Sequence, residues 1–77
     1  MSVIARTTNV SRLLYTSIAD ARSTLMCDEA NGCRITVEEL RMTIVAERRG
    51  AQPRKGLILE LERGIRVRER LLRGGSA

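Results

Sequence analysis

Apolar residues recur at helical spacing in three segments of the chain. In the first segment they fall at i, i+3, i+4 and i+7 intervals, as on one face of an α-helix. These positions are Val10, Leu13, Leu14, Ile18, Ala21 and Leu25. The short polar side chain of Thr8 or Asn9 can accept a hydrogen bond from a free N–H of the first turn. We therefore expect a helix over residues 9–30.

The second segment begins with a capping signal. Thr36 and Glu39 have the spacing of a capping box, in which each side chain bonds the backbone N–H of the other residue. A helical apolar face follows, made of Val37, Leu40, Ile44 and Val45. Gly50 suits the exit, where a residue in the left-handed conformation commonly follows the last turn. This segment predicts a helix over residues 36–49.

The third segment follows Pro53, whose ring fits the first turn of a helix. Arg68 interrupts its apolar stripe where a leucine is expected. Gly56 and Gly64 each weaken a helix by about 1 kcal/mol relative to alanine, which predicts a close helix contact or a kink. We expect a helix over residues 54–73. Its stripe consists of Ile58, Leu61, Ile65 and Leu72, flanked by Leu57 and Leu71.

Three amphipathic helices predict an all-α fold in one small domain, residues 1–77, with frayed ends at 1–8 and 74–77. A chain of 77 residues with one tyrosine and no phenylalanine or tryptophan has a small, aliphatic core. A domain of this size buries only roughly 60% of its unfolded surface, and self-association is one remedy. We expect a homodimer whose shared core is built from Leu14, Ile18, Leu25, Ile58, Leu61, Ile65 and Leu72.

Charge is unevenly distributed along the chain. Residues 1–47 carry five arginines and six acids, net −1, whereas residues 48–77 carry eight arginines, one lysine and three acids, net +6. A guanidinium makes bidentate contacts to carboxylate or phosphate that an ammonium cannot make. The sequence therefore predicts an anionic partner, an acidic protein surface first and nucleic acid second. The expected contact residues are Arg48, Arg49, Arg54, Lys55, Arg63, Arg66, Arg70 and Arg73.

The segment CDEANGC, residues 27–33, is the main candidate for chemistry. A structural zinc site needs four ligands, generally cysteine and histidine, and the chain has two cysteines and no histidine. Five residues between the cysteines also differ from the C-x-x-C spacing of a redox pair. A structural disulfide remains an alternative in an oxidising compartment. We expect no metal or cofactor, and interpret Asn31-Gly32 as a left-handed helix exit.

The same Asn-Gly pair also favours a tight hairpin turn. In that alternative, residues 25–37 form a small ribbon with Glu29 opposite Arg34. The helical apolar stripe is still intact at Leu25, which favours a helix end followed by a loop.

Catalytic and membrane functions are not predicted. Nucleophilic catalysis by serine or cysteine needs an adjacent base; histidine is absent and the sole lysine, Lys55, lies in an expected turn. The segment between Gly50 and Gly56 lacks the pattern of a phosphate-binding loop. No apolar run approaches the ~18–20 residues of a membrane span, and the first residues do not form a secretory signal. We expect a cytoplasmic, non-enzymatic protein.

Two binding functions remain. The first is a regulator or inhibitor that binds another protein, because unpaired apolar stripe suits a helix-in-groove contact and arginines steer association. The second is a helix-turn-helix transcriptional regulator, whose second helix meets DNA with its N-terminal residues. Ala46, Gly50, Arg54 and Lys55 fit that motif in part, but Gly56 stands where a branched apolar residue is usual. The protein-binding function is therefore the preferred prediction.

Overall fold

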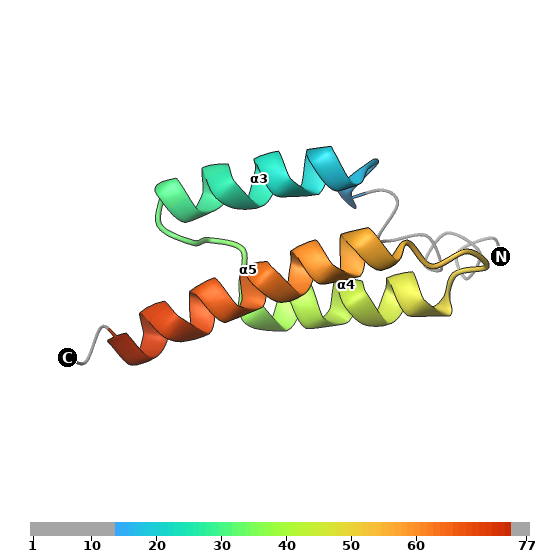
Figure 1. The fold of residues 1–77 in the computed structure, drawn as a ribbon. Coiled ribbons are helices and arrows are strands. Elements are labelled where there is room, and N and C mark those ends of the chain that lie inside the picture. The colour runs from blue at the N-terminus through green and yellow to red at the C-terminus, as the bar shows by residue number, and fades with distance from the viewer. Residues whose placement is uncertain (1–13, 75–77) are drawn as a thin grey trace, which may run out of the picture.

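The computed structural model describes residues 14–74, and helices make up most of this range (Figure 1). Their bounds are Ile18–Ala30 for α3, Val37–Arg49 for α4 and Lys55–Gly74 for α5. Residues 14–74 contain no strand. The predicted all-α fold with three helices is thus confirmed.

Helix α5 lies between α3 and α4 and packs against both (Figure 1). Two ion pairs show that α3 and α5 run parallel. Arg22 Nε lies 3.4 Å from Glu60 Oε1 near the start of both helices, and Arg68 Nη2 lies 2.6 Å from Asp28 Oδ2 farther along both. A parallel pair requires a connection that returns along the molecule, and α4 provides it.

Helix α4 runs antiparallel to α5. Arg41, near the start of α4, pairs with Glu69 near the end of α5, at 2.7 Å. Arg48, at the end of α4, pairs with Glu62 nearer the start of α5, at 3.5 Å. The sequence separation of the paired residues falls from 28 to 14, as expected for a helical hairpin.

Helix α3 begins later than the sequence pattern predicts. Residues 15–17 are not helical, so a continuous helix from residue 9 is wrong at this point. Ser17 caps α3 by accepting a hydrogen bond from the Asp20 N–H at 3.0 Å, and Asp20 Oδ2 accepts one from the Thr16 N–H at 3.1 Å. These two hydrogen bonds fix the start of the helix at Ile18, although the apolar stripe begins earlier in the sequence. The expected caps Thr8 and Asn9 lie outside the described residues.

The capping box of α4 is confirmed. Thr36 Oγ1 accepts from the Glu39 N–H at 3.1 Å, and Glu39 Oε1 accepts from the Thr36 N–H at 2.9 Å. The expected left-handed exit is wrong, because Gly50 is extended with φ −69°. Frayed ends were expected at 1–8 and 74–77, but Gly74 belongs to α5, and 1–8 and 75–77 lie outside the described residues.

The loop between α3 and α4 follows the helix-exit interpretation and not the hairpin alternative. Helix α3 ends at Ala30, as expected, but the left-handed pair begins one residue later than expected: Asn31 has φ −109°, whereas Gly32 has φ 105° and Cys33 has φ 56°. Asp28 organises the loop, since its backbone oxygen accepts from the Cys33 N–H at 2.8 Å. The two cysteines are free thiols.

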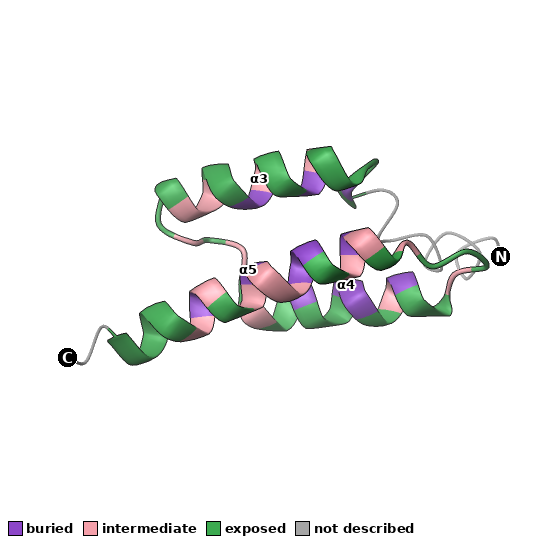
Figure 2. Cartoon of the chain, in the orientation of Figure 1, coloured by how far each residue is buried: buried purple, intermediate pink, exposed green. Residues whose placement is uncertain are grey.

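Buried side chains gather where α5 meets the other helices, whereas the last turns of α5 are exposed (Figure 2). The core is aliphatic apart from one tyrosine. Ile35, Ile58 and Ile65 pack against it while partly exposed. Its buried members are Tyr15, Ala21, Leu25, Leu40, Ile44, Leu57 and Leu61.

Gly56 and Gly64 of α5 lie where α3 approaches, which confirms the expected close contact. A Cβ built on Gly64 would lie 3.1 Å from Leu25 Cδ1 and 3.3 Å from Leu40 Cδ1. A Cβ built on Gly56 would overlap Ile18 Cδ1. The absence of side chains at these positions lets the two helices approach each other closely.

Candidate functional site

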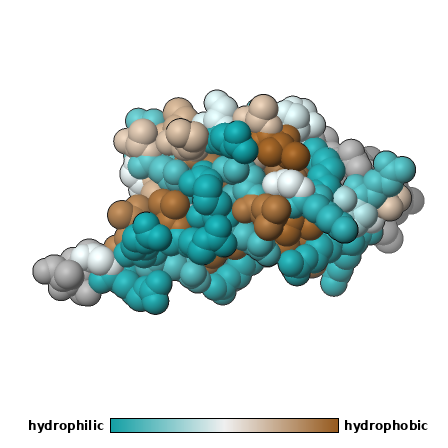
Figure 3. Space-filling model, in the orientation of Figure 1, coloured by the Kyte–Doolittle hydropathy of each residue, from teal (hydrophilic) through white to brown (hydrophobic). Residues whose placement is uncertain are grey.

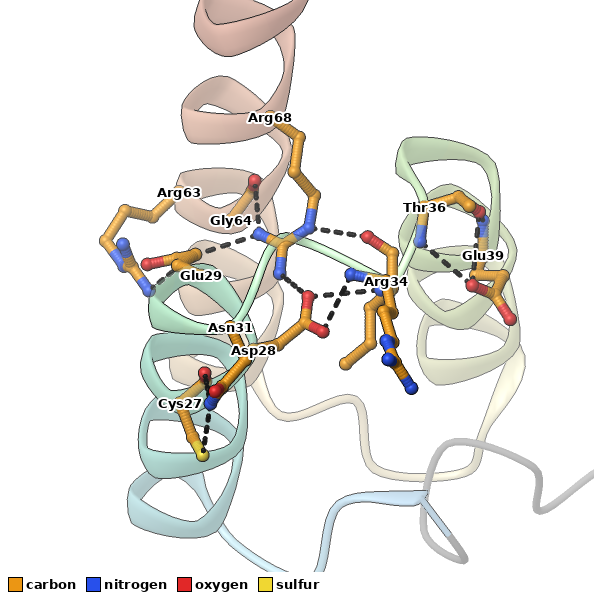
Figure 4. A network of polar contacts seen from close by, with 11 residues as sticks. Cys27, Asp28, Glu29, Asn31, Arg34, Thr36, Glu39, Arg63, Gly64 and Arg68 are labelled. Carbon is orange, nitrogen blue, oxygen red and sulfur yellow. Dashed lines mark hydrogen bonds and ion pairs between the residues drawn. The ribbon is translucent and has the colours of Figure 1, made fainter.

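Arg68 joins α5 to α3 and to the loop before α4 (Figure 4). Its Nε donates to the Ile35 carbonyl at 2.7 Å, and its Nη1 donates to the Gly64 carbonyl at 2.9 Å. Nη1 also meets Glu29 Oε2 at 3.0 Å, and Nη2 meets Asp28 Oδ2 at 2.6 Å. Four of the five N–H donors of a guanidinium are therefore used within the chain.

The carboxylate of Asp28 is held by the same cluster. It accepts from the Arg34 N–H at 2.9 Å and from the Ile35 N–H at 3.1 Å. Burial opposes its ionisation, but the hydrogen bonds from Arg68 and from these two amides outweigh burial and keep the pKa of Asp28 below its ordinary value. Burial likewise opposes the charge of Arg68, yet the bonds to Asp28 and Glu29 raise the pKa of Arg68. The cluster is a structural clamp whose acceptors and donors are already engaged.

Arg54, one of the expected contact residues, is partly buried, with 19% of its side chain exposed. Its Nε and Nη2 donate to the carboxylate of Glu47, each at 3.0 Å, and its backbone N–H donates to the same carboxylate at 2.7 Å. Glu47 is 2% exposed. Arg54 Nη1 also donates to the Tyr15 carbonyl at 3.0 Å. The hydrogen bonds to Glu47 raise the pKa of Arg54, and the group closes the turn between α4 and α5.

Two further expected contact residues also pair within the chain. Arg63 Nε donates to Glu60 Oε2 at 2.8 Å, and Arg63 Nη2 meets Glu29 Oε2 at 3.4 Å. Arg48 reaches Glu62 at 3.5 Å with 61% of its side chain exposed, and exposed pairs of this kind contribute only about 0–1 kcal/mol. Arg63 therefore belongs to the α3–α5 interface, whereas Arg48 stays accessible.

Arg66, Arg70 and Arg73 form the arginine face of α5. Their i, i+4, i+7 spacing places them on one side of the helix, and all three are exposed. Within residues 14–74, Arg66 and Arg70 make no ion pair. Hydrophilic side chains gather over much of α5 in Figure 3. Arg49 and Lys55 are exposed at the α4–α5 turn, so the eight expected residues do not form one surface.

The residues expected to build a shared dimer core also separate into groups. Leu25 and Leu61 are 0% exposed and belong to the core of a single chain. Ile58 and Ile65 pack against that core while partly exposed. The exposed members are Leu14, Ile18 and Leu72, at 54%, 38% and 77%.

A groove of about 450 Å³ opens at the C-terminal end of α5. Cys33 and Ile35 of the loop form one wall, Val37 of the first turn of α4 forms another, and α5 contributes Leu71 and Leu72. We call this the overhang groove, because the end of α5 forms one side of it. Apolar patches also interrupt the hydrophilic surface in Figure 3.

The sequence pattern identified Leu71 and Leu72 on the third helix and Val37 on the second as apolar positions, but not that they surround one groove. The expected helix lengths could have indicated the groove, because the third expected helix is longer than the second by several residues. A hairpin of unequal helices leaves the end of the longer one without a neighbour. Ile35 and Cys33 could not be assigned in this way, because their positions depend on how Asp28 and Arg68 fold the loop.

Other kinds of site receive no support from the described residues. In residues 14–74 no group of three or more histidine, cysteine, aspartate or glutamate side chains is placed to hold a metal ion. The helices in this part of the chain are too short or too polar to span a membrane. Comparisons with protein-family models, curated proteins and solved structures found no match for the chain.

Proposed function

We propose that this chain is a non-enzymatic binding protein, a regulator or inhibitor that docks the arginine face of α5 on an acidic protein surface. The observation that supports the proposal is the pair Arg66 and Arg70, exposed on one side of a helix and without an ion pair in residues 14–74. Guanidinium groups that hold no internal contact are available to bind carboxylates bidentately. They also steer association with an oppositely charged partner.

The contrast with the internal arginines sharpens this proposal. Arg54 and Arg68 are engaged by Glu47, Asp28 and Glu29 and hold the fold together. Their charge is therefore neutralised within the molecule. Arg66 and Arg70, which make no ion pair within residues 14–74, keep their charge for a partner.

The helix-turn-helix alternative is less well supported. Helices of that motif cross at about 90–120°, whereas α4 and α5 lie antiparallel along each other (Figure 1). The motif also presents the N-terminus of its second helix to DNA. Here Arg54, just before α5, is bound by Glu47. DNA binding is accordingly kept as the contrasting outcome of the test.

The test compares three forms of the full chain as immobilised bait in extracts of the cells that make it. The forms are the wild type, Arg66→Gln with Arg70→Gln, and a matched control, Arg34→Gln with Arg49→Gln. The control removes the same charge from exposed arginines elsewhere. We expect acidic proteins that the wild type and the control retain, and that the arginine-face variant loses by at least about tenfold, as for two lost charge-assisted contacts.

The same three forms are then titrated against a labelled random-sequence DNA duplex by fluorescence anisotropy. Duplex binding with a slope of about 0.9 per neutralised phosphate in log–log salt plots, lost in the arginine-face variant, would replace the acidic protein by nucleic acid. Retention of the same proteins by all three forms would show that the arginine face is not the binding site.

A further inference from the structure

The C-terminal end of α5 projects beyond the helices that cover the rest of it. Helix α5 has 20 residues, whereas α3 and α4 have 13 each. Leu71 and Leu72 follow the buried Gly64 and the partly buried Ile65 by seven residues, which is two helical turns, so they continue the core-facing side. They are nevertheless 56% and 77% exposed. In this overhang, residues 69–74, the apolar side chains on the core-facing side of the helix are therefore exposed to solvent.

We propose that the overhang groove binds the α5 overhang of a second copy of this chain, so that two chains join through a twofold contact. The inference does not rest on the proposed function, because the leucine contact at its centre involves neither Arg66 nor Arg70. It also moves the expected dimer interface. Leu25 and Leu61 lie within one chain, whereas Leu72 stays at the interface and Leu71 joins it.

Self-complementarity of the patch favours a second copy as the occupant. A twofold interface uses the same patch on both chains, so the patch must carry both a projection and a matching hollow. Leu72 is the most exposed of the large apolar residues described, at 77%. The groove of about 450 Å³ has Leu72 itself on its rim. One patch therefore contains both halves of the contact.

Charges at the patch are complementary under the same symmetry. Glu38 lines the groove on the α4 side, and Arg73 stands next to Leu72 on the overhang. A twofold axis places the overhang of each chain against α4 of the other, so this acid meets an arginine of the other copy. This contact between opposite charges matters because each chain carries a net charge of +5, so that two copies repel each other overall.

The amount of exposed apolar surface also favours self-association. Stable interfaces bury about 800 Å² on each partner. Among the described residues, seven apolar side chains form the core, whereas eight large ones are exposed by at least 38%. A single chain thus leaves as many large apolar side chains in water as it buries.

A small polar ligand fits the groove less well. Ligand pockets combine apolar walls with a few convergent polar groups that are free to bind. Arg68 is the guanidinium at the groove, and its N–H groups already reach Asp28, Glu29 and the carbonyls of Ile35 and Gly64. The walls that remain free are mostly apolar, as a leucine side chain of a second copy requires.

The first test is analytical ultracentrifugation of the full chain and of two exposed-leucine variants over a range of concentrations. Leu72→Asp places a charge in the proposed contact. Leu59→Asp is the matched control, since Leu59 is 65% exposed on the arginine-face side of α5. We expect a wild-type dimer, an unchanged control, and a dissociation constant raised at least about a hundredfold by Leu72→Asp, because two leucines per dimer lose their burial.

The second measurement uses the two thiols as internal probes. Cys33 lines the groove, whereas Cys27 is exposed on α3. In the Cys27→Ser protein, alkylation of Cys33 should slow about fivefold or more well above the dissociation constant, by mass action. In the Cys33→Ser protein, alkylation of Cys27 should keep the same rate at all concentrations.

Three results would overturn the inference. They are a monomeric wild type at all concentrations, a Leu72→Asp protein that still dimerises, and equal loss of dimer in both aspartate variants. A monomer would assign the groove to a different partner. Circular dichroism of each variant verifies that helix content is retained, as expected for substitutions at exposed positions.

Discussion

At the scale of single residues, Arg68 departs most clearly from the surrounding pattern. The stripe of the third helix calls for an apolar residue there, and the structure places an arginine that is 3% exposed. A buried charge is tolerated only when it is paired and hydrogen-bonded. Asp28 and Glu29 supply the charge, and the carbonyls of Ile35 and Gly64 supply the remaining acceptors.

Substitution Arg68→Leu should lower the free energy of unfolding by about 3–5 kcal/mol, the usual cost of removing one partner from a buried ion pair. The loss follows because Asp28 keeps its charge without a cation, and Glu29 keeps only its longer contact with Arg63, at 3.4 Å. Adding Asp28→Asn and Glu29→Gln should recover part of it. Urea unfolding followed by circular dichroism measures both effects. An Arg68→Leu protein as stable as the wild type would show that the clamp contributes no net stability.

The carboxylate of Asp28 should also make stability depend on pH. Its pKa is lower in the folded chain than the ordinary value of 3.8. The ionised form therefore favours folding, and this contribution is present above the unfolded pKa and lost as the pH falls through the folded one. We expect the difference in Tm between the wild type and Asp28→Asn to narrow on going from about pH 6 to about pH 2.

The control for this titration is Glu62→Gln, which alters a carboxylate whose ion pair with Arg48 lies at the surface, where such pairs contribute only about 0–1 kcal/mol. Its offset in Tm from the wild type should be small across the same range. A constant offset for Asp28→Asn as well would mean that the carboxylate of Asp28 is not ionised to a different extent in the folded chain.

At the scale of helices, short sequence motifs predicted features that depend on residues close together in the sequence. The bounds of α4 followed from Thr36 and Glu39, which are close in sequence and bond each other directly. The start of α3 was predicted too early. The apolar stripe runs without a break through this region, but Ser17 and Asp20 form a helix cap within it. Ion pairs between helices, such as Arg68 with Asp28, join residues 40 positions apart. No periodic pattern reveals them.

The two glycines of α5 should respond differently to alanine. Gly64→Ala crowds Leu25 and Leu40, which are 0% exposed and cannot move aside, so we expect a loss of about 1–3 kcal/mol from overpacking. Gly56→Ala meets only the end of Ile18, a side chain 38% exposed. That side chain can rotate away, and the gain in helix propensity of up to about 1 kcal/mol offsets the contact.

Thermal and urea unfolding of the two alanine variants provides the comparison. Each variant is the other's control, since the chemical change is identical. Equal effects at both positions would mean that helix propensity, and not the approach of α3, determines why glycine occupies them.

At the scale of the whole molecule, the fold class and the three helical segments could be predicted from the sequence. Which arginines form internal ion pairs and which stay on the surface could not. A sequence contains the same arginine whether it lies in a clamp or on a surface. Arg54 and Arg63 were expected to face a partner and are held by Glu47 and Glu60. The arginine face could be identified only once these internal ion pairs were known.

Uneven cover along α5 should appear in hydrogen exchange. Amides over residues 58–66 lie between α3 and α4, whereas the overhang, 69–74, meets α4 through the Arg41–Glu69 ion pair at its start and is exposed over 70–74. In the Leu72→Asp protein, the overhang amides should exchange at least about tenfold faster than the central ones, because they open locally. Uniform protection along α5 would show that the helix opens as one unit.

The parallel course of α3 and α5 determines where other proteins can be attached. Tyr15 is held at the start of α5 by Arg54, and Gly74 lies at the far end of that 20-residue helix, about 30 Å away at 1.5 Å per residue. A fluorescent protein or affinity tag attached directly after Gly74 would stand beside the overhang groove and block it. The same attachment at the end of the bundle where Tyr15 lies would leave the groove accessible.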